Sequence, residues 1–288
     1  MIDAHHHLWD LAAVEYPWLA AKGTPRFFGD PTPIQKTYGF DDFFADSVGH
    51  GATGSVHIQV GAADPLVEAR WVQAVAEAQQ DWRMAQVAFC DLTSADRSAN
   101  LDELQRMSTV RGVRQIVGRA PGEDAETGTQ DLLDNSEFLS GLQELGERGL
   151  SFDLQLIPEL MDRMAQLLAQ APNTAVALCH AGSPHDRTVM GLSEWAKTLR
   201  ALSDLPQVYC KISGLGMFQH HWEVADFKPI IQTCLDQFGA ERCMFGSNFP
   251  VDSLYSDYDR LFEAHMACVP VSDHAAVFGE TATQFYQL

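Results

Sequence analysis

Two histidines near the start of the chain, His5 and His7, are separated by one residue in a short segment with the spacing of a β-strand. Alternate residues of a strand lie on the same face, which places Asp3 with His5 and His7 and turns His6 toward the helices. The two Cα atoms are then about 6.6 Å apart, near enough for both imidazoles to ligate one metal ion. Histidines with this spacing also occur as hydrogen-bonded core residues, so the pair needs support from elsewhere in the chain.

Polar residues in other apolar segments give that support. His180 ends the segment TAVALCH, before a break at Ala-Gly-Ser-Pro, and Ser247 and Asn248 end the segment that begins at Cys243. Further polar residues alternate with apolar ones: His57, Gln59, Arg114, Asp153, Gln155 and Lys211. Each has a structural alternative, such as an ion pair between Asp153 and one of the cations. Together they favour a functional site, because buried charges are costly unless they are paired or used.

Eight strand-length segments must position these residues. They are Ile2 to His7, Ser55 to Val60, Ala85 to Leu92, Val110 to Val117, Leu150 to Ile157, Thr174 to His180, Gln207 to Ser213 and Cys243 to Phe249. Segments of helical periodicity lie between them, beginning for example at Pro65, Leu160, Leu192 and Pro229. This alternation predicts a parallel sheet and an α/β fold, a single-domain (β/α)8 TIM barrel over residues 1–288. A doubly wound sheet competes, but HHHLWD stands where a glycine-rich dinucleotide turn would be expected.

Two segments fall outside this pattern. The first connection, Leu8 to Asp41, is rich in proline, glycine and aromatic residues without a clear helix, which predicts a lid over the barrel mouth. After the eighth unit, Asp273 to Tyr286 is predicted to form an extra C-terminal helix. Functional groups of such barrels lie at the C-terminal ends of the strands, where several of the candidate residues occur.

Charge and composition exclude several classes of protein. The 19 Lys and Arg against 39 Asp and Glu give a formal charge of −20, which repels nucleic acids and anionic membranes. The six cysteines are scattered without a CxxC pair, as expected of reduced thiols. Without a signal-peptide pattern or a long apolar run, the chain is expected to be cytoplasmic. A small-molecule substrate is the expected partner, and the sequence leaves open whether the chain forms a homo-oligomer.

The order of the motifs resembles that of the metal-dependent amidohydrolase superfamily. The resemblance covers the whole chain and rests on IDAHHHLWD, YPWL, GVRQIV, GLSFDLQL, HAGSP, YCKISGLGMF, RCMFGSNFPVD and FYQL. Within the superfamily, the chain is similar to the amidohydrolase-2 branch, which contains sugar lactonases such as fuconolactonase, sulfomuconolactone hydrolase and 2-pyrone-4,6-dicarboxylate lactonase. The resemblance implies a (β/α)8 barrel and a hydrolase, without indicating one substrate.

The resemblance also implies catalytic residues. In the family, a first-strand H-x-H, a sixth-strand histidine and an eighth-strand aspartate surround the reacting bond. The matching residues here are His5, His7, His180 and Asn248. The family's aspartate passes a proton from the attacking water to the leaving group, and an amide cannot do this. Either another carboxylate, Asp252 or Asp153, or an imidazole must then transfer the proton.

Two alternatives follow for a cofactor. Either His5, His7 and His180 bind one divalent ion, Zn²⁺ or Mn²⁺, or the site works without a metal, because an amide in place of the carboxylate weakens binding. Some lactonases of this branch are understood to use cations and imidazoles instead. The residues predicted to contact the substrate are Trp9, His57, Gln59, Arg114 and Lys211.

The expected activity is the opening of a lactone of a sugar acid or a carboxylated small molecule by water. The histidines polarise the carbonyl and stabilise the oxyanion. An alkoxide leaving group needs less protonation than an amine, which favours an ester substrate at a site without the usual aspartate. The rival hypotheses are a metal-dependent non-oxidative decarboxylase or hydratase of the same branch, and a binding protein that has lost catalysis through Asn248.

Overall fold

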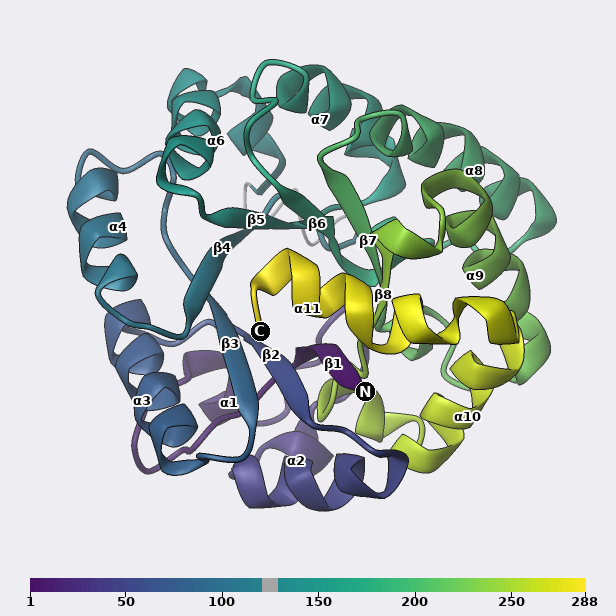
Figure 1. Cartoon of the computed structure of the whole chain (residues 1–288), viewed down its shortest axis with the longest axis horizontal. Helices are drawn as coiled ribbons and strands as arrows, with labels where there is room; N and C mark the ends of the chain where they lie inside the picture. Colours follow the sequence, from purple (N-terminus) through teal and green to yellow (C-terminus); the bar gives the residue numbers. More distant parts are fainter. Residues whose placement is uncertain (121–128) are drawn as a thin grey trace.

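Eight parallel strands alternate with helices around a common axis in the computed structural model of the chain, which describes residues 1–120 and 129–288 (Figure 1). The strands are β1 (Ile2–His6), β2 (Gly54–Ile58), β3 (Arg83–Ala88), β4 (Val110–Ile116), β5 (Ser151–Gln155), β6 (Val176–Leu178), β7 (Val208–Ile212) and β8 (Cys243–Phe245). They pair in sequence order. Two backbone hydrogen bonds of 2.7 Å, from Asn248 to His5 and from His7 to Phe249, join the first and last units. The predicted (β/α)8 barrel is therefore confirmed.

The helices surround the strands on the outside of the barrel (Figure 1). They are α2 (Phe40–Ser47), α3 (Pro65–Ala78), α4 (Arg97–Gln105), α6 (Ser136–Arg148), α7 (Met161–Leu168), α8 (Val189–Ser203), α9 (Val224–Phe238) and α10 (Tyr258–Cys268). Capping side chains and proline residues determine where these helices begin. The Asp64 carboxylate accepts from the first free amides of α3, while Pro65 needs no partner there. The helix predicted from Pro229 begins earlier, at Val224, because Asp226 caps the Glu223 amide at 2.8 Å.

The first connection contains more helix than the sequence predicts. It includes α1 (Pro17–Ala20) and a 3₁₀ turn at Thr32–Ile34 before α2 begins at Phe40. Two indole N–H groups fix it: Trp9 donates to the Lys36 carbonyl at 2.6 Å, and Trp18 donates to the Val60 carbonyl at 2.7 Å. Residues of this connection therefore form a wall over the C-terminal ends of the first two strands.

The other end of the barrel is closed by the C-terminal segment. The predicted helix from Asp273 to Tyr286 is divided into a π-helical turn, Ala276–Glu280, and α11 (Thr281–Tyr286), which crosses the barrel axis in Figure 1. Its last residue, Tyr286, is buried in an apolar cluster inside the barrel with Ile2, Ala4, Val56, Ile58, Ala85, Val87, Ala177, Met244 and Ala282. The interior is thus sealed at one end and available for chemistry at the other. Among the described residues, no helix has the length and apolarity of a membrane span.

Candidate active site

Three imidazoles meet at the C-terminal end of the barrel. The ring centroid of His5 lies 4.5 Å from that of His180 and 5.1 Å from that of His7. All three side chains are buried. The structure therefore brings together the three histidines that the sequence selected from distant segments.

An irregularity in the pairing of β1 determines where the imidazole rings of His5 and His7 point. The pairing of β1 with β2 shifts between Asp3 and His6. Before the shift, Asp3 faces the helix layer, where it accepts hydrogen bonds from the Tyr258 hydroxyl and the Ser247 amide. After it, His5 and His7 point to the mouth. The prediction that Asp3 shares their face is wrong, because it assumed uninterrupted alternation.

A left-handed turn positions the third ring. His180, Ala181 and Ser183 have φ values of 56°, 52° and 54°, and Gly182 between them has 70°. Non-glycine residues rarely adopt this conformation, which costs about 1–2 kcal/mol per residue. The His180 Nδ1 lies 3.0 Å from the Ser213 hydroxyl, and a Cβ at Gly214 would lie only 2.4 Å from that nitrogen. Packing thus holds the strained turn and its imidazole in place.

A cavity of about 520 Å³ opens above these rings. Among the predicted residues, His7, Trp9, Gln59, Arg114, His180 and Asn248 line it. Aromatic residues of the first connection form one side: Trp9, Trp18, Phe27 and Phe28. No aspartate or glutamate is among the described lining residues, although the whole chain carries a formal charge of −20.

Arg114 is the central cation of this cavity. One of its terminal nitrogens donates to Gln155 Oε1 at 3.2 Å, the other donates to the Gln59 carbonyl, and its Nε has no partner in the part of the chain that the structure describes. Arg26 and Arg119 also line the cavity, and the sequence analysis missed both. They lie in connections rather than strands, so alternation carried no signal for them.

Asp153 and Lys211 lie outside the described lining of the cavity. Both side chains are fully buried, and their charged groups are 2.5 Å apart. The Tyr286 hydroxyl of α11 donates to Asp153, while the Lys211 ammonium lies 4.8 Å from the centre of its ring. The ion pair that the sequence offered as the structural alternative is therefore present, and neither residue is placed to contact a molecule in the cavity.

His57 faces away from the barrel interior. Its neighbours Val56 and Ile58 point inward, while its Nδ1 accepts from the Leu8 amide at 3.1 Å and its Nε2 lies 3.8 Å from Glu68 of α3. The structure thus corrects its placement as a substrate-binding residue. His57 and Gln59, which simple alternation would place on one face, point in different directions, because Gln59 lies beyond the end of β2 and turns to the cavity.

The loop after β8 supplies an amide and a carboxyl. Asn248 Oδ1 lies 3.3 Å from His7 Nε2, and Asn248 Nδ2 lies 2.5 Å from Asp252 Oδ2. Asp252 is buried, accepts from the Gly216 amide at 3.1 Å, and is not among the lining residues of the cavity. Asn248 therefore separates Asp252 from the cavity.

Burial and neighbouring cations set the charges of the site. Burial lowers the pKa of His180 to about 3, with Arg114 and Lys211 adding to the effect. Burial also lowers the pKa of His5 and His7 well below the usual value. The three imidazoles are therefore neutral at pH 7 and retain a lone pair each. Burial raises the pKa of Asp252 to about 7.

The donor set does not match a divalent metal site. Within residues 1–120 and 129–288, no three His, Cys, Asp or Glu side chains have the arrangement of metal ligands. Asn248 stands where the resemblance to the family implies a carboxylate, and burial followed by the positive charge of Arg114 lowers the pKa of both His7 and His180. That charge disfavours a dication as it disfavours an imidazolium. Side chains of the cavity alone are therefore left to activate the water and to stabilise the oxyanion.

Known proteins resemble the whole chain. The family model described as "Amidohydrolase" matches residues 2–288. The uncharacterized protein y4mH of Sinorhizobium fredii is 35% identical, over 100% of this chain and 98% of its own length. An L-fucono-1,5-lactonase of Burkholderia multivorans is 26% identical, over 100% and 96%. The crystal structure of a B. multivorans amidohydrolase with bound zinc superposes with a TM-score of 0.83 at 23% identity, covering 100% and 99% of the two chains.

Proposed function

Because the chain belongs to the amidohydrolase family, whose model matches it from residue 2 to residue 288, we propose that it hydrolyses a lactone bearing a negative charge. The relatives named L-fucono-1,5-lactonase support ester hydrolysis as the reaction. The observation that carries the proposal is the cavity, which combines neutral imidazoles with arginines and has no acidic residue among its described lining.

The cavity lining favours an anionic substrate with an apolar face. Arg26, Arg114 and Arg119 line it within a strongly acidic protein. Guanidinium groups bind carboxylates and other oxyanions through paired N–H donors. The aromatic side, formed by Trp9, Trp18, Phe27 and Phe28, suits the flat face of a small unsaturated or poorly hydroxylated ring. A carboxylated lactone fits both properties better than a neutral polyhydroxyl one.

The reaction needs one activated water and one stabilised oxygen. The lone pair of the neutral His180 imidazole accepts a proton from the water as the water oxygen bonds to the lactone carbonyl carbon. Arg114 donates toward the carbonyl oxygen, which becomes negative in the tetrahedral intermediate. The ring C–O bond then breaks, and the ring oxygen takes up the proton to give a hydroxy acid. An alkoxide leaves without the strong acid that an amine would require.

A panel of cyclic substrates tests the proposal. Acid release is followed for lactones with a carboxylate, for neutral aldonolactones and for lactams of the same ring size, each with and without chelator. We expect the carboxylated lactones to exceed the neutral ones at least about tenfold in kcat/KM, consistent with one charged hydrogen bond. We also expect no lactam turnover and no effect of chelator. Turnover of lactams alone, release of CO₂, or activity restored only by added Zn²⁺ would reverse the assignment.

A further inference from the structure

The amide of Asn248 connects an imidazole in the cavity wall to a carboxyl behind it. His7 and Asn248 both line the cavity, whereas Asp252 does not. The backbone of Asn248 has a φ of 58°, and its amide N–H donates to the His5 carbonyl at 2.7 Å. The side chain is thereby fixed between its two partners. The position of the carboxamide leaves two orientations, which differ in whether its oxygen or its nitrogen faces His7.

Hydrogen-bond matching decides that direction. His7 Nδ1 lies 2.8 Å from the Ile58 carbonyl, which can only accept, so this nitrogen carries the proton. The Nε2 of a neutral His7 is then an acceptor and requires a donor from Asn248. The two ends of a carboxamide have nearly the same shape, so a half-turn of the group exchanges them without moving a neighbour. With Nδ2 toward His7, the oxygen of Asn248 faces Asp252, which must then donate an O–H.

The neighbouring charges favour this neutral arrangement over its alternative, an imidazolium at His7 with a carboxylate at Asp252. Arg114, His57 and His180 face His7 and oppose a positive charge there, in addition to burial. Burial likewise opposes a negative charge on Asp252.

Two charged or titratable groups act on the carboxyl from other elements. Arg187, on the connection before α8, lies near enough to favour its ionised form. Tyr255, at the end of the turn Val251–Leu254, also faces it, but the Tyr255 hydroxyl donates to the Phe28 carbonyl. The Gly216 amide donates to Oδ1 of Asp252, which leaves Oδ2 as the oxygen that carries the proton toward Asn248.

We infer, on the basis of the hydrolase function proposed above, that Asp252 is a positioning residue that acts as a neutral carboxylic acid and turns the N–H end of Asn248 toward the cavity. One N–H of Asn248 binds His7, and the second is available to the carbonyl oxygen of the substrate. Asn248 is then a catalytic residue that donates, together with Arg114, to the oxyanion. An amide at this position therefore does not mean that catalysis has been lost. Ionisation of Asp252 reverses the amide and presents an oxygen to the developing oxyanion.

Substitutions at Asp252 test this arrangement through kinetics. Asp252→Asn keeps a donor toward Asn248 and an acceptor for Gly216, so at pH 6 it is expected to retain kcat within about fivefold. Asp252→Ala is expected to lose at least about tenfold in kcat with a smaller change in KM. The wild type is expected to lose activity as the pH rises through about 7, and Asp252→Asn is expected to lack that loss. An inactive Asp252→Asn together with wild-type activity that increases above pH 7 would show an ionised Asp252 acting as the base.

Two measurements without substrate separate this inference from the proposed function. The melting temperature of Asp252→Asn, relative to the wild type, should increase from pH 4 to about pH 7 and then level off, because the pKa of Asp252 is about 7 in the folded state and 3.8 in the unfolded state, so the wild type loses stability across that range. Nitrogen-15 NMR of the wild-type protein at pH 6 should show His7 as the neutral Nδ1–H tautomer. An imidazolium signal for His7, or a pH-independent difference in melting temperature, would overturn the inference even if every lactone were hydrolysed.

Asn248→Asp provides a third check on the role of the amide. A carboxylate at this position presents acceptors to the substrate oxyanion and adds a second acid beside Asp252. We expect kcat to fall at least about tenfold. A gain of activity would instead show that the reaction uses a carboxylate at this position to transfer a proton, as the resemblance to the family implies.

Discussion

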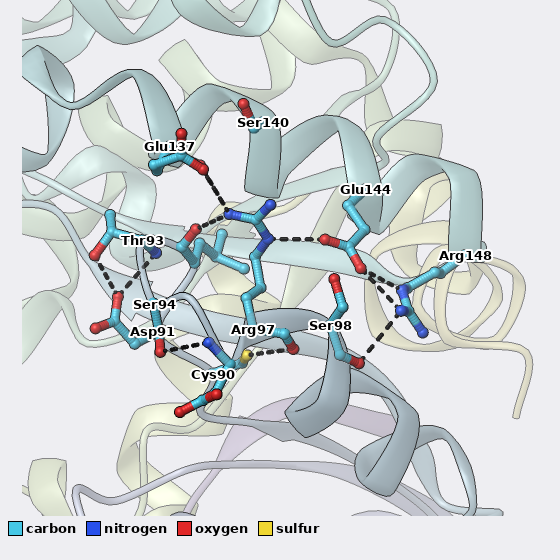
Figure 2. Close-up of polar contacts among 12 residues, drawn as sticks. Cys90, Asp91, Thr93, Ser94, Arg97, Ser98, Glu137, Ser140, Glu144 and Arg148 are labelled. Carbon is cyan, nitrogen blue, oxygen red and sulfur yellow. Dashed lines mark hydrogen bonds and ion pairs between the residues drawn. The ribbon is translucent and has the colours of Figure 1, made fainter.

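Two polar regions of the barrel differ in how completely their groups are paired. Between α4 and α6, Figure 2 shows Glu144 between Arg97 and Arg148, each of which lies 2.8 Å from one oxygen of its carboxylate. Arg97 also donates to the Leu92 carbonyl at 2.7 Å, and Arg148 donates to Asp102 at 2.6 Å. At the C-terminal end of the barrel, both ring nitrogens of the buried His5 and the Nε of Arg114 have no hydrogen-bond partner among residues 1–120 and 129–288.

This difference separates stabilising groups from functional ones. Partial burial acts to raise the pKa of Glu144, but hydrogen bonds from Arg97, Ser98 and Arg148 outweigh it and lower that pKa. The charged form is therefore the favoured one, and the network contributes to folding. An unpaired buried polar group costs about 1–3 kcal/mol instead. Arg114 Nε is such an atom in the lining of the cavity, where a bound molecule can accept its hydrogen bond.

The largest expected effect distinguishes the two regions by activity. Arg114→Met removes the donor to the substrate carbonyl, and we expect kcat/KM to fall about 100- to 1000-fold, the range for loss of an oxyanion donor. Arg148→Met, at the C-terminal end of α6 and outside the described lining of the cavity, should leave kcat/KM unchanged. Steady-state kinetics on a carboxylated lactone measures both. Equal losses in the two variants would show that the arginine at the mouth only supports the fold.

A second comparison concerns the sign of the stability change. His5→Leu removes unpaired polar atoms from the interior, so we expect the free energy of unfolding to be unchanged or higher by about 1 kcal/mol. Glu144→Leu leaves Arg97 and Arg148 without their shared partner, and we expect it to lose about 1–2 kcal/mol while activity is kept. Urea unfolding of both variants measures the difference. A strongly destabilised His5→Leu would mean that its ring is a packing element.

The smallest expected effect is a difference in acid sensitivity. The folded-state pKa of His180 is about 3, below the unfolded value of 6.5, so its contribution to stability is complete above pH 6.5 and is lost as the pH falls toward 3. Glu144 has a lowered pKa, so its contribution is lost only below its unfolded value of 4.5. His180→Gln should therefore flatten the stability profile between pH 6 and 5, and Glu144→Gln should not. Denaturant unfolding at a series of pH values checks this.

Much of the site could be predicted because strand ends converge in a closed parallel barrel. His5, His7, His180 and Asn248 were selected from their positions at the ends of apolar segments, and Arg114 from its alternation within one. The predictions that depended on unbroken alternation were less reliable. A register shift in β1 reversed Asp3, and His57 faces Glu68 rather than the mouth. One inserted residue turns every later side chain to the other face.

Residues in connections could not be assigned from periodicity. Arg26 and Arg119 reach the cavity from loops, and Trp18 reaches it from a four-residue helix. The deep pair of Asp153 and Lys211 is the opposite case, since alternation placed both side chains inward but could not say how far along the barrel axis they would lie. The hydroxyl of Tyr286, in α11 at the closed end of the barrel, donates a hydrogen bond to Asp153 of that pair.

The sequence by itself determined the eight strand-helix units, the polar residues at the strand ends and the amide at Asn248, since these are properties of local order and residue type. Only the tertiary structure decided which polar groups are paired and which remain without a partner. Pairing depends on distances between segments far apart in the chain, such as the 2.5 Å between Asn248 and Asp252 and the 3.3 Å between Asn248 and His7. Burial at that meeting point, which no local pattern encodes, sets the charge of each group and therefore its chemistry.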